Sequence, residues 1–215
     1  GFWHGEMWNR RKDGELFAAL QSVTAVRDAS GRVIHYVSVF ADISQIKAHE
    51  AELDRVANYD SLTGLPNRRL LSDRLNQSII RSDRSGKLTA VCFLDLDGFK
   101  SVNDRLGHEE GDHALIAAAK ILTRTFRVSD IISRIGGDEF AILVIDADEA
   151  MMEKLLLRFY RLINNYNARK AASFKLAISI GYAFYDPLKP TTLDEMISTA
   201  DAMMYKMKKV RYRRA

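Results

Sequence analysis

From Asp60 to the end of the chain, segments typical of β-strands alternate with segments typical of α-helices, and this alternation limits the possible folds more than any other feature. The expected strands are 88–94, 131–135, 140–145 and 174–184, and the expected helices are 66–82, 109–126, 150–166 and 193–209. The two middle strands flank Gly136-Gly137-Asp138-Glu139 and are predicted to form a hairpin. Strands interleaved with helices, with one hairpin among them, predict an α/β or α+β sandwich with a single covered sheet.

Residues 1–42 are predicted to be β-structure. The segments 15–26 and 32–40 are rich in Val, Phe, Tyr and Ser, and Asp28-Ala29-Ser30-Gly31 between them is typical of a turn. One or two hairpins cannot bury a core by themselves. This segment is therefore either an incomplete domain or a sheet that packs on something else.

A helix is expected over residues 43–59, which contain neither Gly nor Pro. Spacings of three and four residues give one side of this helix a heptad pattern with one polar position, formed by Ile43, Ile46, Glu50, Leu53 and Ala57. Two heptads are fewer than a coiled coil usually needs. The helix is either a plain connection or an aid to dimer formation.

Charge and composition exclude several classes of protein. The net charge is +4, but the last ten residues hold six basic and no acidic side chains, which leaves −2 for residues 1–205. Such a basic end is typical of a solvated helix terminus, and no nucleic-acid partner is expected. The apolar stretch 88–94 is far shorter than the ~18 residues of a membrane span. Because Cys92 is the single cysteine, we expect a reducing, cytoplasmic location, although the full-length protein could be tethered to a membrane.

Two motifs contain carboxylates that are candidates for chemistry. Asp95 and Asp97 end an apolar strand and share one face of it, so they form either a divalent-metal site or, through Asp97, a cap for a short helix starting near Phe99. Gly136 and Gly137 are expected to give the hairpin turn positive φ and close approach of a ligand. Asp138 and Glu139 then lie at the tip, either as a solvated turn or, beside the Asp95 strand, as a shared site for Mg²⁺ of the kind that nucleotidyl transfer requires.

The segment F-K-S-V-N-D-R-L-G-H-E-E-G-D (99–112) offers groups suited to a nucleotide. Lys100 is a candidate phosphate contact, and Asn103 and Asp112 carry the amide and carboxylate edges that pair with a purine. The alternatives are helix caps for Asn103 and Asp112, and a structural role for His108. This segment becomes informative only together with the other motifs.

Four segments together resemble a GGDEF domain, the domain of the diguanylate cyclases. They are D-S-L-T-G-L-P-N-R-R (60–69), F-L-D-L-D-G-F-K-S-V-N-D-R-L-G-H-E-E-G-D (93–112), R-I-G-G-D-E-F (134–140) and A-I-S-I-G-Y-A (177–183). They occur in the family's order, and the resemblance covers residue 60 to about residue 210. It implies an α+β sandwich with a central, mostly antiparallel sheet wrapped by helices, similar to nucleotidyl cyclases and to ferredoxin-like polymerase palms.

The resemblance also implies an activity, the condensation of two GTP into cyclic di-GMP with release of two pyrophosphates. It implies that Mg²⁺ (or Mn²⁺) is held by the side chains of Asp95, Asp138 and Glu139 and the backbone carbonyl of Leu96. Asp138 and Glu139 are the implied catalytic residues, with Asp138 accepting the proton of the attacking 3′-hydroxyl. The implied GTP-binding residues are Lys100, Asn103, His108, Asp112, Gly136, Gly137 and Lys208.

Regulation and assembly follow from the same resemblance. Each domain holds one GTP, so two chains are expected to face each other in a homodimer. Arg127 and Asp130 match the family's R-x-x-D site, at which cyclic di-GMP inhibits; the alternative is a surface ion pair. Because Arg211-Tyr212-Arg213 replace the family's G-R-N run after Lys208, a catalytically degenerate module that senses GTP or cyclic di-GMP is the alternative function.

The N-terminal segments W-N-R-R-K-D-G-E, V-R-D-A-S-G-R-V and F-A-D-I-S resemble the C-terminal strands of a PAS sensor domain. The expected organisation is therefore the C-terminal part of a PAS domain (1–42), a connecting signalling helix (43–59) and a GGDEF diguanylate cyclase domain (60–215).

Overall fold

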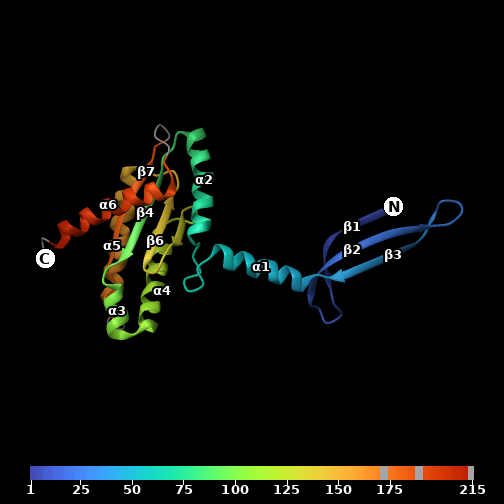
Figure 1. Cartoon of the computed structure of the whole chain (residues 1–215). Coiled ribbons are helices and arrows are strands. Elements are labelled where there is room, and N and C mark those ends of the chain that lie inside the picture. The colour runs from blue at the N-terminus through green and yellow to red at the C-terminus, as the bar shows by residue number, and fades with distance from the viewer. Residues whose placement is uncertain (170–173, 187–190, 213–215) are drawn as a thin grey trace. The chain divides into compact units, whose positions relative to one another are not determined.

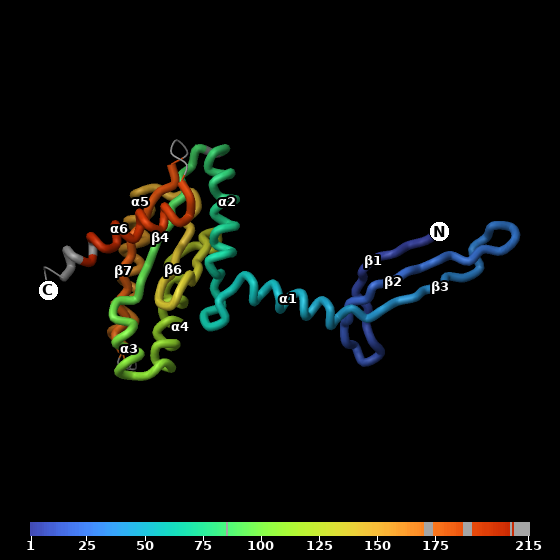
Figure 2. The backbone as a smooth tube through the Cα atoms, viewed as in Figure 1, coloured from blue at the N-terminus to red at the C-terminus, as the bar shows by residue number. Residues whose placement is uncertain are grey.

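The structure is a computed structural model that describes residues 1–169, 174–186 and 191–212. The chain divides into two compact units, Gly1–Ala57 and Asn58–Ala215, and each contains its own antiparallel sheet (Figures 1 and 2). Within the described residues, no helix combines the length and the apolar character of a membrane span.

The first unit is a three-stranded sheet of order β1-β2-β3, with β1 Phe2–Arg10, β2 Leu16–Arg27 and β3 Val33–Asp42. The predicted turn between β2 and β3 is confirmed, because Asp28 N–H donates to Arg32 O and Gly31 has a φ of 84°. β1 has no counterpart among the two segments that the sequence singled out. Few side chains of this sheet are buried; Phe17 is among them, but most of its large apolar residues, such as Trp8 and Phe40, are exposed.

Helix α1 Ser44–Asn58 follows the sheet. Ile43 precedes it and is buried, and its backbone N–H donates to Ala18 O at 2.9 Å. Ile43 therefore belongs to the sheet's small core rather than to the heptad pattern of the helix. Ile46 and Leu53 are 56% and 70% exposed, so the middle of that pattern faces solvent.

The second unit confirms the expected α+β fold. Its sheet has the order β5-β6-β4-β7, all antiparallel, formed by β4 Thr89–Leu96, β5 Ile131–Arg134, β6 Glu139–Val144 and β7 Ile178–Tyr185. Five helices accompany it: α2 Arg68–Ser85, α3 Phe99–Leu106, α4 His108–Thr125, α5 Glu149–Asn167 and α6 Leu193–Tyr212.

Central strand β4 divides the core by the two-residue period of a strand. Cys92 and Leu94 pack in one cluster with residues of α4 and α5, including Leu122 and Phe159. Val91 packs in a second cluster with residues of α2 and α6. Because β4 is covered on both faces, its apolar run ends only where Asp95 reaches the edge of the core.

Several predicted boundaries differ from the structure by a few residues, and two of these differences have a local cause. β7 begins at Ile178 rather than at residue 174, because the Asn167 amide bonds both N–H and C=O of Leu176, each at 2.8 Å, and takes the place of a neighbouring strand. Helix α2 begins at Arg68, since Asn67 is its N-cap and accepts from Leu70 N–H at 3.1 Å, while Pro66 forms a bridge with Tyr59.

Candidate active site

The carboxyl end of β4 lies directly beside the G-G-D-E turn. In the antiparallel register Asp95 is opposite Glu139 of β6 and Ser179 of β7. The N–H of Leu96 donates to the carbonyl of Asp138 at 3.3 Å. The structure thus brings Asp95, Leu96, Asp138 and Glu139, which lie more than forty positions apart in two motifs, to one edge of the sheet.

The two glycines of the turn act differently from the expectation. Neither Gly136 nor Gly137 has a positive φ, so the prediction of a left-handed turn is wrong. A Cβ on Gly136 would lie 2.7 Å from Glu139 Oε2, whereas one on Gly137 would meet open space. A side chain at residue 136 would therefore displace the Glu139 carboxylate from its position, and Gly137 leaves the turn open to a ligand.

Arg134 stabilises this turn through hydrogen bonds to its backbone. Its Nε and Nη2 donate to the carbonyl of Gly137 at 3.0 and 2.7 Å, and its Nη1 forms an ion pair with Asp60 at 3.0 Å. Asp60 also accepts from the N–H and hydroxyl of Thr63. Burial raises the pKa of Asp60, but the Thr63 hydrogen bonds and Arg134 outweigh it, so the pKa lies below its ordinary value. The D-S-L-T segment is thereby joined to the turn.

Lys208 of α6 lies between the carboxylates of Asp95, in β4, and Asp97, which follows the strand. Its Nζ is 2.6 Å from Asp95 Oδ1 and 2.7 Å from Asp97 Oδ1. Burial lowers the pKa of Lys208, but hydrogen bonds to Asp95 and Asp97 outweigh it and raise the pKa above its ordinary value. Lys208 is therefore charged, and it offsets one of the two negative charges of Asp95 and Asp97.

Asp97 does not cap the short helix, so that alternative is wrong. The N-cap of α3 is Gly98, with a φ of 74° and no side-chain cap. The Asp97 carboxylate instead accepts from Ser179 Oγ at 2.8 and 2.9 Å, in addition to its contact with Lys208. Asp97 and Asp95 thus contact the same positive group, the ammonium of Lys208.

Residues Asp95 and Asp97 fit a divalent cation, because both already converge on one positive group. Among residues 1–169, 174–186 and 191–212, no group of three or more His, Cys, Asp or Glu is arranged to hold a metal. Mg²⁺, however, is usually bound through one or two carboxylates together with phosphates of the substrate. This edge therefore supplies the protein's share of such a site.

Asp138 lies half-buried beside this charged group. Burial is the largest influence and raises the pKa of Asp138; the negative charge of Asp95 adds to it, while a backbone hydrogen bond, Lys208 and Arg134 act in the opposite direction. Its carboxylate is consequently a stronger base than that of a solvated aspartate.

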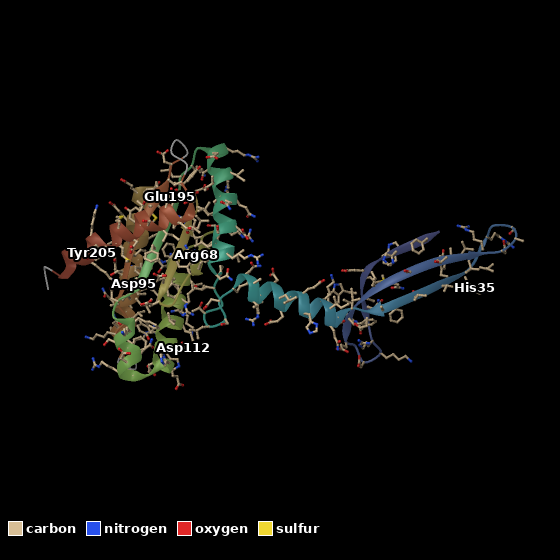
Figure 3. All side chains as sticks on the ribbon, in the orientation of Figure 1. His35, Arg68, Asp95, Asp112, Glu195 and Tyr205 are labelled. Atoms are coloured by element: carbon tan, nitrogen blue, oxygen red, sulfur yellow. The ribbon has the colours of Figure 1, made fainter. Side chains whose placement is uncertain are left out.

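The predicted nucleobase contacts come from two consecutive helices. Lys100 and Asn103 belong to α3, whereas His108 and Asp112 lie in the first turns of α4. The side chains of Lys100, His108 and Asp112 are exposed. Figure 3 labels Asp95 on β4 and Asp112 on α4, the strand and helix that carry the two parts of the candidate site. Asn103 Oδ1 is buried and has no hydrogen-bond partner among the described residues.

The R-x-x-D segment lies between α4 and β5. Asp130 is buried and accepts from the backbone N–H of Arg127 at 2.9 Å and of Ile145 at 3.3 Å. Its hydrogen bond with Arg127 is thus made by the backbone. The Arg127 side chain is exposed and lines a hollow of about 410 Å³ together with Lys154 and Arg158.

Three residues at or beside the site were assigned no role from the sequence: Asp60, Arg134 and Ser179. Arg134 and Asp60 occur in recognised motifs, but their contact spans 74 positions and has no local signal. The side chains of Arg211 and Tyr212, and the whole of Arg213, lie outside the described residues, so the altered run after Lys208 has no structural description.

Comparison with known proteins agrees with this geometry. The family model "Diguanylate cyclase, GGDEF domain" matches residues 57–214. The chain is 41% identical over 157 residues to the bifunctional diguanylate cyclase/cyclic di-GMP phosphodiesterase MucR of Pseudomonas aeruginosa, covering 73% of this chain and 23% of that protein. It is 32% identical over 181 residues to the diguanylate cyclase DgcP of Escherichia coli, covering 84% and 53%.

The chain therefore spans about a quarter and about half of the length of these two relatives. Among solved structures, the GGDEF domain of TpbB (YfiN) from Pseudomonas aeruginosa is similar with a TM-score of 0.63 at 34% identity, covering 70% of this chain and 88% of that one. The family match extends over most of the chain and includes every residue of the site described above. The chain belongs to the GGDEF diguanylate cyclase family.

Proposed function

We propose that this chain condenses two GTP into cyclic di-GMP and releases two pyrophosphates. One observation carries the proposal: the antiparallel register places Asp95 opposite Glu139, with Asp138 at the same edge. Attack of a 3′-hydroxyl on an α-phosphate needs a base near the hydroxyl and positive charge near the phosphates. This edge of the sheet offers carboxylates and a lysine for both tasks.

In this proposal Asp138 accepts the proton of the attacking 3′-hydroxyl, and Glu139 supports it. The carboxylates of Asp95, Asp138 and Glu139 and the carbonyl of Leu96 would hold Mg²⁺ or Mn²⁺. When bound, the ion neutralises charge on the attacking and leaving oxygens. Gly136 and Gly137 leave room for the phosphates.

Lys100 and Lys208 would contact the triphosphate, and Asn103 and Asp112 would read the guanine, with His108 lining the site. Lys208 contacts Asp95 and Asp97, and in this proposal it would exchange those carboxylates for phosphate oxygens when GTP binds. The cationic side chain thus remains neutralised in both states.

Each domain would hold one GTP, so two chains must meet in a homodimer. The test is incubation with GTP and Mg²⁺ over a protein dilution series, with chromatographic detection of cyclic di-GMP and sedimentation of the same samples. Activity per chain is expected to fall as the dimer dissociates. Constant specific activity at concentrations where only monomer sediments would contradict the two-chain mechanism.

A GTP or cyclic di-GMP sensor without catalysis is the second candidate function. The feature in its favour is the run Arg211-Tyr212-Arg213, which replaces the family's G-R-N after Lys208. The same assay separates the two candidates, because a sensor would bind GTP and form no cyclic di-GMP.

Arg127 and Asp130 are proposed to bind the product. Asp130 orders the turn through two backbone amides, and Arg127 lines a hollow together with the basic Lys154 and Arg158 and the acidic Asp148. Arg127→Ala should weaken product inhibition by about thirtyfold, because charge-assisted hydrogen bonds to phosphate are lost, while the initial rate on GTP stays near wild type. The measurement is the inhibition constant of added cyclic di-GMP.

Arg124→Ala is the matched control, since this exposed arginine lies three residues earlier and does not line that hollow. Equal inhibition of wild type and Arg127→Ala would show that Arg127 takes no part in product binding.

Residues 1–42 are proposed to be the C-terminal part of a PAS sensor, with 43–59 as the signalling helix and 60–215 as the cyclase domain. The support is a three-stranded antiparallel sheet with little core of its own and an α1 whose apolar side chains are exposed. An exposed apolar stripe on this helix is suited to pairing two chains.

A further inference from the structure

Gly111 is a buried glycine inside a helix whose backbone gives no reason for a glycine. It is the fourth residue of α4, and its φ is not positive. Glycine within a helix destabilises it relative to alanine. Some neighbour of Gly111 must therefore need the space that a methyl group would fill.

That neighbour is the side chain of Asn103. A Cβ on Gly111 would overlap Asn103 Oδ1 and would lie 3.0 Å from Asn103 Cγ, with Phe99 Cε2 at 3.4 Å. The steric limit is the same for either orientation of the amide, since oxygen and nitrogen are of similar size. Asn103 thus occupies the position that any side chain at residue 111 would take.

The Asn103 amide packs against Gly111, and its oxygen has no hydrogen bond among the described residues that would hold it there. The backbone carbonyl of Asn103 accepts from Gly107 N–H at 2.9 Å, and Gly111 N–H donates to Gly107 O at 3.3 Å, so the backbones of α3 and α4 are joined at Gly107. Within the described part of the chain, Asn103 Oδ1 is buried without a partner. A buried polar atom left unpaired in this way is costly, so the position of this amide against Gly111 calls for an explanation.

We propose that Gly111 is a positioning residue for base recognition: because it has no side chain, the Asn103 amide packs against α4 beside Asp112. The inference rests on the proposed GTP-binding function and adds to it the reason for a glycine at this position. Gly111 touches no substrate; it acts through Asn103.

The experiment measures the dissociation constants of GTP and ATP by calorimetry for wild type, Gly111→Ala, Asn103→Ala and the double variant. Gly111→Ala should weaken GTP binding by about tenfold and ATP binding far less, because only the guanine contact is displaced. In the Asn103→Ala background, Gly111→Ala should have no further effect on GTP affinity, since the clash is gone. Lys120→Ala, an exposed position on the same helix, is the control.

Thermal melts accompany each measurement. Unchanged GTP affinity in folded Gly111→Ala overturns the inference, and so does an equal loss in both backgrounds, which would mark a general defect of α4. If Gly111→Ala does not fold, the double variant should fold; its failure to do so also overturns a role through Asn103. Wild type that binds GTP no better than ATP overturns the proposed function itself, and with it this inference.

Discussion

Asp138→Asn is expected to lower the rate of cyclic di-GMP formation by about 10³-fold, equal to about 4 kcal/mol of transition-state stabilisation. The amide has the shape of the carboxylate but can neither accept the proton of a 3′-hydroxyl nor contribute negative charge to a cation. The hydrogen bond from Leu96 N–H goes to the backbone carbonyl of Asp138, so the substitution leaves it in place. The fold should therefore be intact.

The measurement is single-turnover formation of cyclic di-GMP beside a thermal melt. Asp83→Asn is the matched control, because Asp83 is an exposed carboxylate on α2, away from the carboxyl end of β4 where Asp95 lies. A well-folded Asp138→Asn with near-normal turnover would remove Asp138 from the mechanism.

The sequence predicted those parts of the site that lie within one motif or one hairpin. Leu94-Asp95-Leu96-Asp97 ends a strand whose apolar period is plain, and the β5–β6 hairpin is closed by a short local turn. Antiparallel pairing then leaves little freedom: once β6 pairs with β4, Glu139 must lie near Asp95. Local patterns therefore singled out these carboxylates as candidates, whereas their roles came from the resemblance to the family.

Contacts between distant segments could not be predicted in this way. Lys208 meets Asp95 across 113 positions, and a lysine near a helix end has the same appearance whether it is solvated or paired. Strand β7 begins at Ile178 and not at residue 174 because the Asn167 amide bonds the backbone of Leu176. Asparagine is also common in ordinary loops, so the sequence carries no signal for this contact. The conformation of the Gly136-Gly137 turn was mispredicted, because neither glycine has a positive φ; Gly136 instead lies against the end of the Glu139 side chain.

Arg134→Met is expected to lower turnover by about a hundredfold, the second large effect. Arg134 is 14% and Asp60 20% exposed, and the guanidinium contacts Gly137 O and Asp60 together. Without it, the carbonyl of Gly137 loses two hydrogen bonds, so the turn that carries Asp138 is free to shift. A displacement of about 1 Å in a reacting group is sufficient for a rate loss of this size.

Stability should respond as well. Removing one member of a partly buried ion pair leaves Asp60 uncompensated, and we expect the free energy of unfolding to fall by about 2 kcal/mol, between the values typical of surface and buried pairs. Denaturant unfolding and GTP turnover are measured on the same samples. Arg84→Met serves as the control, since Arg84 is exposed near the end of α2.

Two further variants separate the two contacts of Arg134. Arg134→Lys keeps the charge beside Asp60 but has a single ammonium in place of the planar fork, so it should recover part of the stability and little of the turnover. Asp60→Ala removes the ion pair and retains the bonds to Gly137, so its loss of turnover should be smaller than that of Arg134→Met. If Asp60→Ala instead abolished turnover as fully as Arg134→Met, the D-S-L-T segment rather than the Gly137 carbonyl would be what positions Asp138. A folded Arg134→Met with wild-type turnover would show that the turn keeps its shape without either contact.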